Sequence, residues 1–203
     1  LHVRSRRQRQ MCIRDSLKPV SEVRFLSGAQ IGVWCGVEVR WRVVKMTIEL
    51  RPLRVEDATE MADVLSDRTL YTFTGGGPPS EDELARRYAI QTRGESSDGA
   101  EEWINFVVTL GAGKQPIGYV QATVPRSGGA TEIAWVIGTQ WQGHGYAKEA
   151  VKLLSTYLAE RGITHLIAHI HPDHIASQRV AATVGLVPTG QVVDGEVRWD
   201  RRE

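Results

Sequence analysis

Apolar runs bounded by turn residues predict seven β-strands in the part of the chain that follows Met46. The predicted strands cover residues 47–51, 103–110, 116–124, 131–138, 163–170, 186–193 and 196–200. Short loops join the second, third and fourth of these strands, so we expect the three to pair as antiparallel neighbours. Asp194-Gly195 is typical of a two-residue hairpin turn between the last two strands.

Helical spacing of apolar residues predicts four helices between the strands. Three of them cover residues 55–65, 147–158 and 175–184, and a capping box of Ser80 and Glu83 starts the fourth, which runs to about residue 92. Strand 163–170 follows a strand and a helix, so we expect it to lie parallel to strand 131–138. The pattern predicts an α+β fold with a mixed, mostly antiparallel twisted sheet, one central parallel pair and about four flanking helices.

Composition adds limits to this picture. A length of 203 residues with 41% hydrophobic and 24% charged residues suits one domain with a sizeable core. Because no apolar run approaches the roughly 20 residues of a bilayer-spanning helix, we expect no membrane association. Cys12 and Cys35 form no CxxC pair, so a reducing cytoplasm is the expected location.

Charge is divided unevenly along the chain. Residues 1–45 carry ten Lys or Arg against three acidic residues, whereas the remainder carries 15 basic and 21 acidic residues. An acidic body disfavours nucleic acid and favours cationic ligands such as amines. The segment from Arg9 to Ser16 resembles translated sequencing-adapter read-through. We therefore expect residues 1–45 to be a non-native or disordered leader and residues 46–203 to form the domain.

A glycine-rich turn, Trp141 to Ala147, lies between the predicted strand 131–138 and the helix 147–158. Such a turn directs backbone N–H groups and a positive helix end to one point, which suits a phosphate group. The turn lacks the Lys-Ser/Thr of a P-loop and the full GxGxxG of a dinucleotide site. It has instead Gln142-x-x-Gly145-x-Ala147 at the start of an amphipathic helix.

The segment from Gln142 to Ala147 resembles the Q/R-x-x-G-x-G/A motif of the GCN5-related N-acetyltransferase (GNAT) superfamily. Four flanking segments resemble their counterparts in that family: 46–53, 132–137, 148–150 and 177–186. The resemblance spans roughly residues 46–200 in the expected order. It is strongest toward the branch that contains ribosomal-protein and aminoglycoside acetyltransferases.

This resemblance implies a GNAT fold, acetyl-CoA as cosubstrate and direct transfer of an acetyl group to a primary amine, with no metal. The central parallel pair would splay apart to admit the pantetheine arm, and the turn would hold the pyrophosphate. The residues expected to contact the cofactor lie in the strand, in the turn and before the last helix: Trp135, Val136, Ile137, Gln142, Gly143, His144, Gly145, Tyr146, Ala147 and His174.

Three residues are the expected catalytic candidates, each with a structural alternative. Glu132 precedes the splayed strand and could deprotonate an ammonium group, or could be a solvated strand-edge carboxylate. His174 could contact the cofactor, act as a base or cap a helix. Ser177 could lie near the thiol, or be an ordinary first-turn serine. Many GNAT members carry a tyrosine as general acid where this chain has Ala181.

The acceptor is expected to be an amine of a small molecule or of a protein N-terminus. The protein is expected to be a monomer or a homodimer. Trp103 and Asn105 are the expected substrate-binding residues, although a strand tryptophan is also a common core residue. The loop around Gly75 to Gly77 could form a mobile lid or a plain connection.

Two other function classes stay open. The missing tyrosine keeps a non-catalytic acyl-CoA-binding or sensing domain in consideration. The segment from His169 to His174 fits the H-x-H-x-D-H motif of metallo-β-lactamase-like hydrolases, with His169, His171, Asp173 and His174 as candidate ligands. That fold draws further histidine ligands from downstream, and no histidine follows His174. The hydrolase is therefore the remote alternative.

Overall fold

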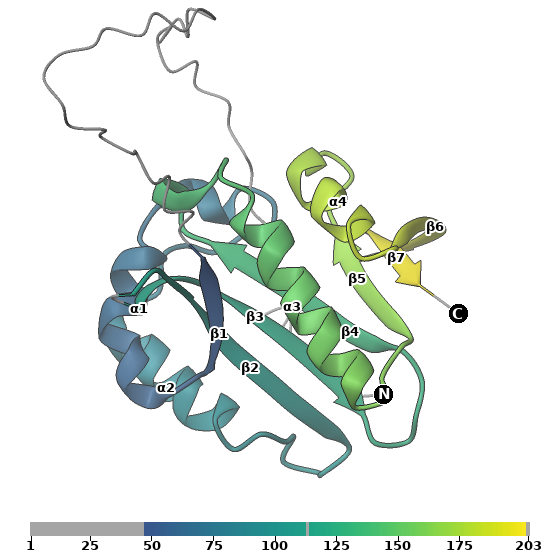
Figure 1. The fold of residues 1–203 in the computed structure, drawn as a ribbon, viewed down its shortest axis with the longest axis horizontal. Coiled ribbons are helices and arrows are strands. Elements are labelled where there is room, and N and C mark those ends of the chain that lie inside the picture. Colours follow the sequence, from purple (N-terminus) through teal and green to yellow (C-terminus); the bar gives the residue numbers. More distant parts are fainter. Residues whose placement is uncertain (1–46, 113, 202–203) are drawn as a thin grey trace, which may run out of the picture.

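A seven-stranded sheet forms the centre of the computed structural model, which describes residues 47–112 and 114–201 (Figure 1). The predicted leader, residues 1–45, lies outside the described residues. The strands are β1 (Ile48–Pro52), β2 (Glu101–Leu110), β3 (Gln115–Pro125), β4 (Thr131–Ile137), β5 (Leu166–Ile170), β6 (Val187–Val193) and β7 (Glu196–Arg201). Their order across the sheet is β1-β2-β3-β4-β5-β7-β6. The predicted number of strands is confirmed.

Every neighbouring pair in the sheet is antiparallel except β4 and β5, which run parallel. The predicted parallel pair is therefore confirmed. The β6–β7 hairpin turns at Asp194 and Gly195, whose φ angles are 51° and 84°. Two successive positive φ angles are the requirement of the predicted two-residue turn.

The four predicted helices are α1 (Ala58–Val64), α2 (Glu81–Gln91), α3 (Tyr146–Glu160) and α4 (Ile175–Ala182). Ser80 caps α2 as predicted, because its Oγ accepts the Glu83 N–H while the Glu83 carboxylate accepts the Ser80 N–H. Residues 55–57, which the periodicity assigned to the first helix, form a separate 3-10 turn before α1.

The predicted strand 163–170 is too long at its start. The N–H of Ile163 donates to the Leu158 carbonyl at 2.9 Å, and Gly162 takes a φ of +76°. This is the pattern that closes a helix C-terminus, so Ile163 belongs to the end of α3. The strand β5 begins only at Leu166.

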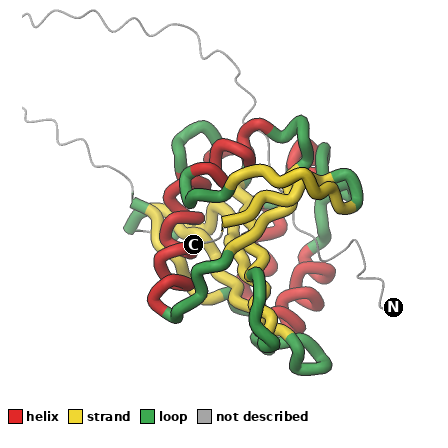
Figure 2. Tube along the Cα trace, turned by 90° about the vertical axis from the view of Figure 1, so that its right-hand side faces the viewer, coloured by secondary structure: helices red, strands yellow, loops and turns green. Residues whose placement is uncertain are grey.

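Helices cover the sheet on both sides (Figure 2). On one face, α3 and α4 pack on the larger apolar core, to which β4 contributes Ile133, Trp135 and Ile137. On the other face, α1 and α2 pack on a smaller core that includes Val107 and Val136. Alternating residues of each strand therefore serve two different cores, which fixes which side chains can meet on each face.

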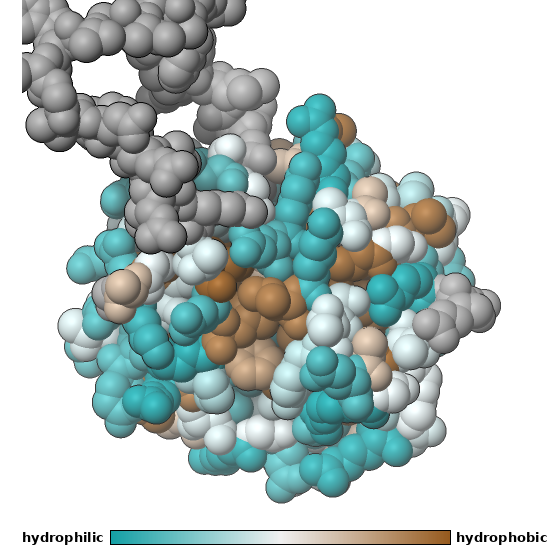
Figure 3. Space-filling view, in the orientation of Figure 1, coloured by the Kyte–Doolittle hydropathy of each residue, from teal (hydrophilic) through white to brown (hydrophobic). Residues whose placement is uncertain are grey.

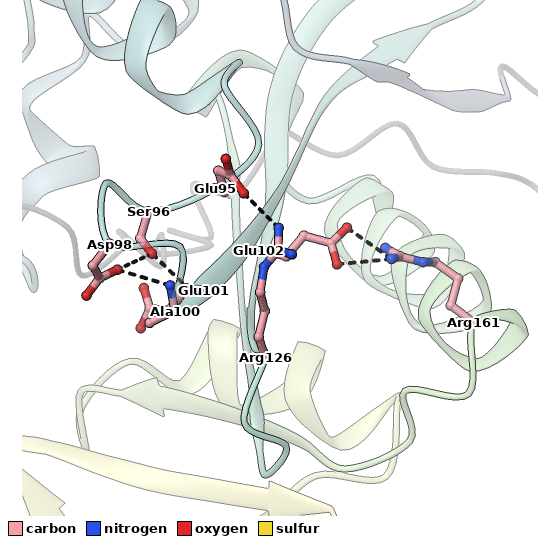
Figure 4. Close-up of polar contacts among 8 residues, drawn as sticks. All are labelled: Glu95, Ser96, Asp98, Ala100, Glu101, Glu102, Arg126 and Arg161. Carbon is pink, nitrogen blue, oxygen red and sulfur yellow. Dashed lines mark hydrogen bonds and ion pairs between the residues drawn. The ribbon is translucent and has the colours of Figure 1, made fainter.

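Ion pairs join three elements at the far end of the sheet from the glycine-rich turn (Figure 4). The guanidinium of Arg161, at the end of α3, donates two hydrogen bonds of 3.0 Å to the Glu102 carboxylate of β2. Arg126, after β3, pairs with Glu95 at 2.8 Å. The Arg161–Glu102 pair fixes the C-terminal end of α3 against the sheet, and the Arg126–Glu95 pair joins the loop after β3 to the segment before β2.

The α3 face also carries apolar surface (Figure 3), and the Leu153 and Tyr157 side chains of α3 are 39% and 38% exposed. Within residues 47–112 and 114–201, none of the helices combines the length and the apolar character of a bilayer-spanning segment.

Candidate active site

The parallel pairing of β4 and β5 covers two residue pairs, Thr131 with Leu166 and Glu132 with Ile167. From there β4 continues beside β3, and β5 continues beside β7. The two fully described strands therefore separate after Glu132. We call the space between residues 133–137 of β4 and 168–170 of β5 the β4–β5 opening. The predicted splay of the parallel pair is present.

Backbone groups of β4 face this opening. The N–H of Thr131 donates to the His165 carbonyl at 2.9 Å, so the Thr131 backbone faces β5. At the other end of the strand, the Gly138 N–H donates to the Ile117 carbonyl on the β3 side. Strand residues present their backbone groups alternately to the two neighbours. The residues whose N–H and C=O face the opening are therefore Ile133, Trp135 and Ile137.

Val136 is oriented differently from the other predicted cofactor residues of β4. A Cβ atom built on Gly118 of β3 would lie 2.0 Å from the Val136 carbonyl oxygen, which shows that this carbonyl faces β3. The Val136 side chain is fully buried in the core beneath α1 and α2. The structure therefore brings the backbones of Trp135 and Ile137 to the opening, and not that of Val136.

The glycine-rich turn follows β4 through a 3-10 turn, Thr139–Trp141. Gly143 and Gly145 have φ angles of +79° and +83°, which favour glycine, and a Cβ at either position would meet open space. Gly145 is the N-cap of α3, and the first N–H groups of that helix have no carbonyl of their own helix to bond. The helix end therefore presents backbone N–H groups and the positive end of the helix dipole.

Two side chains of the turn hold its conformation. Gln142 folds back so that its Nε2 donates to the Ile137 carbonyl at 2.9 Å, which ties the turn to the end of β4. His144 donates from Nδ1 to the Gln142 carbonyl at 2.8 Å, and its ring stacks on Tyr146 with centroids 5.5 Å apart. Both residues thus brace the turn from within.

One pocket runs from the turn to the part of β4 that borders the β4–β5 opening. It is lined by Trp135 and Ile137 of β4, by the turn, by the first residues of α3, and by Ala176 and Val180 of α4. Seven of the predicted cofactor residues line it: Trp135, Ile137, Gln142, Gly143, Gly145, Tyr146 and Ala147. Val136, His144 and His174 do not contribute to this lining.

Lys148 also lines the pocket and was missed by the sequence analysis. It lies in the first turn of α3, where a cation is unfavourable beside the positive end of the helix dipole. A lysine at that position is a sequence signal for a bound anion, which would offset this cost.

Glu132 does not stand alone at the opening. Its Oε1 lies 2.8 Å from Nδ1 of His169, and the side chains are 29% and 12% exposed respectively. His169 lies two residues beyond Ile167, the last residue of β5 that pairs with β4, so its side chain belongs to the opening. The sequence analysis considered His169 only as a metal ligand, because nothing in the sequence pairs residues 132 and 169.

A second ion-pair cluster continues from His169 across the same sheet face. Arg198 of β7 is the cross-strand partner of His169. Its guanidinium donates to Asp200 at 2.8 Å, and Asp200 also lies 3.1 Å from Nε2 of His165. Burial alone would raise the Asp200 pKa, but hydrogen bonds from Arg198 and His165 outweigh it, and the pKa lies below the usual aspartate value.

His174 and Ser177 meet in the first turn of α4. His174 is 1% exposed and caps the helix, with its Nδ1 accepting the Ser177 N–H at 3.4 Å. Its Nε2 lies 3.3 Å from Ser177 Oγ. The Phe73 ring, in the loop before α2, lies 4.6 Å from the His174 ring and 5.0 Å from the His171 ring. The capping role expected as an alternative for His174 is therefore present.

Trp103 and Asn105 lie on the sheet face that also carries Glu132. In the register, Trp103 is opposite Thr123, and Thr123 is opposite Glu132. Neighbouring strands lie about 4.8 Å apart, so Trp103 is about 10 Å from Glu132 across this row. Asn105 donates from Nδ2 to the Gln91 carbonyl at 3.3 Å, at the end of α2.

Polar atoms are buried beneath α2 on this same side. Burial raises the pKa of Tyr71 to about 12, and it also raises the pKa of Tyr88, so neither hydroxyl ionises near neutral pH. Tyr71 donates to the Leu65 carbonyl at 2.7 Å. The Tyr88 hydroxyl and Gln91 Oε1 are buried and have no hydrogen-bond partner among the described residues. Such atoms call for a water or ligand partner.

The four candidate metal ligands are engaged with different neighbours. His169 pairs with Glu132, and His174 caps α4 beneath Phe73. His171 Nδ1 accepts the Asp173 N–H at 3.2 Å, while the Asp173 side chain is 82% exposed. Among residues 47–112 and 114–201, no three His, Cys, Asp or Glu side chains are grouped as metal ligands would be.

Known proteins share both the sequence pattern and this fold. The model of the acetyltransferase (GNAT) domain family matches residues 47–187. An uncharacterized N-acetyltransferase of Bacillus subtilis, YnaD, is 24% identical over 156 residues, which cover 74% of this chain and 88% of that protein.

Solved structures agree. A GNAT-family acetyltransferase from Bacillus anthracis superposes with a TM-score of 0.61 at 19% identity, covering 75% of this chain and 92% of its own. The aminoglycoside acetyltransferase AAC(6')-Ib in complex with coenzyme A gives a TM-score of 0.61 at 16% identity, with coverage of 76% and 94%. The resemblance noted in the sequence is thus confirmed: the chain belongs to the GNAT family of acetyltransferases and is an N-acetyltransferase.

Proposed function

We propose that this protein transfers the acetyl group of acetyl-CoA to a primary amine by direct attack. One observation carries the proposal: one pocket is lined both by the β4 residues that border the β4–β5 opening and by the turn at the start of α3. A long ligand with a peptide-like arm and a pyrophosphate needs these two features together. The cosubstrate supplies an acetyl thioester, and the protein supplies binding, orientation and proton transfer.

The residues fit such a ligand. Gly143 and Gly145 leave open space where side chains would stand, and the N-terminus of α3 favours a diphosphate. Lys148 adds a positive charge beside it. Backbone groups of Trp135 and Ile137 would bond pantetheine amides as an added strand does. His144 would affect cofactor binding only indirectly, because it holds the conformation of the turn. Val136 packs in the core beneath α1 and α2 and would hold β4 in place.

Proton removal from the acceptor is assigned to the Glu132–His169 pair, which lies at the start of the opening. An ammonium group must lose a proton before its nitrogen can attack a thioester carbonyl. A carboxylate and an imidazole 2.8 Å apart form a proton acceptor whose positive form is stabilised by the adjacent negative charge.

Protonation of the leaving sulfur is assigned to Ser177 and His174. Because His174 Nδ1 accepts a backbone N–H, its neutral ring carries the proton on Nε2, which donates to Ser177 Oγ. The Ser177 hydroxyl then has its own proton to donate, one helical turn before Ala181 on α4. This arrangement replaces the tyrosine that many family members carry.

The acceptor is an amine on a small molecule or a protein N-terminus, bound on the sheet face of Glu132. Trp103, Asn105 and the buried polar atoms of Tyr88 and Gln91 lie on that side. An aromatic side chain and a carboxylate suit a cation. The structural neighbour AAC(6')-Ib acetylates aminoglycosides, which are amines of this kind. Cytoplasmic location and a monomeric or homodimeric state remain proposals, which fractionation and light scattering would test.

The test combines calorimetric titration with coenzyme A and a thiol-release assay on a panel of amines. We expect coenzyme A to bind and thiol release to exceed background with at least one amine. Absence of coenzyme A binding would sink the cofactor assignment, whereas binding without release on the whole panel would support the second candidate.

That second candidate is a non-catalytic acyl-CoA sensor. Ala181 supports it, because this residue is fully buried and has no hydroxyl to offer a thiolate. The measurement above separates the two candidates, and Ala181→Tyr would sharpen it: a rise in thiol release in this variant would argue that the wild-type protein lacks an efficient acid.

A further inference from the structure

We propose that His169, and not Glu132, is the base that accepts the acceptor's proton, and that Glu132 is a positioning residue acting through it. This inference rests on the proposed function. It is carried by the contact between Glu132 Oε1 and His169 Nδ1, at 2.8 Å, together with the place of His169 within the β4–β5 opening.

The contact fixes the tautomer of His169. An ionised carboxylate has only acceptor oxygens, so a 2.8 Å contact requires the hydrogen on Nδ1 of the imidazole. In the neutral ring Nε2 is then the proton acceptor. The two nitrogens lie on different sides of the ring, so Nε2 is directed away from Glu132. Among the described residues, Nε2 has no hydrogen-bond partner, and it is not a buried orphan atom.

The position of His169 suits the reacting nitrogen. Glu132 is opposite Ile167, so His169, two residues later in the parallel register, is level with Ala134. Ile133 and Trp135, on either side of Ala134, turn their backbone groups toward the opening. An acetyl group bound by those backbone groups would lie beside the imidazole. Glu132 lies one step behind it, at the point where the strands are still paired.

Two charged side chains lie next to His169. Glu132 faces it from β4, and Arg198 faces it from β7. Arg198 is held by Asp200, which also accepts from His165, so its charge is largely compensated. On the remaining side, the loop before α2 contributes the uncharged ring of Phe73 to the nearby His171. Glu132 is thus the charged side chain in direct contact with the His169 ring.

The proton inventory balances. The acceptor ammonium R–NH3⁺ gives one proton to His169 Nε2, and the imidazolium keeps its Nδ1–H on Glu132. The freed amine lone pair forms the C–N bond, the C–S bond breaks, and the electron pair leaves with sulfur. The second nitrogen proton is lost as the C–S bond breaks and replaces the one that Ser177 donates to sulfur. The products are R–NH–CO–CH3, a CoA thiol and an imidazolium that releases its proton to solvent.

The experiment compares His169→Gln, Glu132→Gln and the control His165→Gln, which removes the histidine directly before β5, whose Nε2 lies 3.1 Å from Asp200. Coenzyme A affinity is measured first. If His169→Gln does not bind coenzyme A, His169→Asn is used in its place. We expect affinity within about twofold of wild type for all variants. We expect kcat to fall at least 100-fold in His169→Gln, about tenfold in Glu132→Gln, and less than twofold in His165→Gln, in keeping with the usual weight of general-base catalysis.

The pH profile distinguishes the two roles. If His169 is the base, Glu132→Gln keeps the low-pH limb, over which kcat/KM rises with pH, because the titrating imidazole is still present. If Glu132 is the base, Glu132→Gln removes that limb and loses more activity than His169→Gln, which overturns the proposal. Added imidazole is expected to restore part of the activity of His169→Ala.

The identity of the base and the acetyltransferase activity can be tested separately. Wild-type protein that turns over an amine, with His169→Gln equally active, overturns the base assignment and leaves the acetyltransferase proposal intact. Wild-type protein that binds coenzyme A but acetylates no amine of the panel overturns both.

Discussion

The two ends of the proposed active site are built in different ways. The cofactor end consists mostly of backbone: two glycines of positive φ, the first turn of α3 and the inner edge of β4. The acceptor end consists of side chains from β2, β4, β5 and α2 that meet only through the sheet register. The first end depends on local conformation and the second on long-range pairing.

The two ends should therefore tolerate substitution differently. A site made of backbone groups requires particular residues, such as glycine, at a few positions and tolerates substitution at the positions around them. A side-chain surface can be altered one strand at a time, while the cofactor end stays intact. The same division predicts that substitutions at one end should leave the binding constant of the other end nearly unchanged.

Gly118→Ala should affect both ends of the site, because Gly118 lies in β3, the strand that pairs with both β2 and β4. A Cβ at this position would lie 2.0 Å from the Val136 carbonyl oxygen, and backbone cannot yield as a flexible side chain does. We expect a loss of about 3 kcal/mol in the free energy of unfolding, the upper range for overpacking. Coenzyme A and amine binding should weaken together. Denaturant unfolding measures the first effect, and unchanged stability would contradict the close approach of β3 and β4.

Asp200→Asn should affect only the side-chain end. It removes the acceptor of Arg198 and His165, which we expect to cost about 2 kcal/mol of stability at pH 7, typical of hydrogen bonds between charged groups. The folded-state pKa of Asp200 is lowered, so its contribution is complete above the unfolded-state value of about 4 and disappears as the pH falls through the lower folded-state pKa.

The stability difference between wild type and Asp200→Asn should therefore be constant near neutral pH and should shrink below about pH 4. Asp63→Asn is the matched control, because Asp63 is exposed on α1 and is expected to change stability little. Thermal unfolding at a series of pH values would measure both variants. A difference that persists unchanged at pH 2 would argue against the ion pair as its source.

Gly145→Ala should affect only the cofactor end. A non-glycine residue at a φ of +83° costs about 1–2 kcal/mol, and the new methyl group would occupy the space before the turn. We expect about a tenfold loss of coenzyme A affinity. Gly190→Ala is the control, since Gly190 also faces open space but has no positive φ. Calorimetric titration of both variants would measure this, and equal affinities would place the pyrophosphate elsewhere.

Trp103→Ala should give the smallest effect and sharpen the boundary between the two ends. Trp103 is half-buried on the Glu132 face of the sheet, so its loss should raise the KM for the amine about fivefold, in keeping with about 1 kcal/mol for an aromatic contact to a cation. The coenzyme A dissociation constant should not change, and Trp103→Phe should lie between the two proteins. Steady-state kinetics at saturating acetyl-CoA would measure the KM, and thermal unfolding would measure stability. A fall in kcat and stability with an unchanged KM would show that Trp103 is a core residue instead.

Local patterns in the sequence determined the elements, the capping box of Ser80 and Glu83, the hairpin at Asp194-Gly195 and the glycine-rich turn before α3. These features depend on residues within a few positions of one another, so periodicity, caps and glycine positions are sufficient to predict them. The cofactor end was predictable for the same reason. The local pattern missed the inclusion of Ile163 in the end of α3, the orientation of Val136 toward β3 and the place of Lys148 in the pocket.

Tertiary structure alone decided the partners of the reactive side chains. Glu132 and His169 are 37 positions apart and meet because β4 and β5 pair in one register. The sequence suggested His169 as a ligand in a metal motif, whereas the sheet directs its side chain to Glu132. A shift of one residue in the strand pairing would turn the Glu132 or His169 side chain to the opposite face. The register of the sheet, which no local pattern encodes, therefore determines the chemistry at the acceptor end.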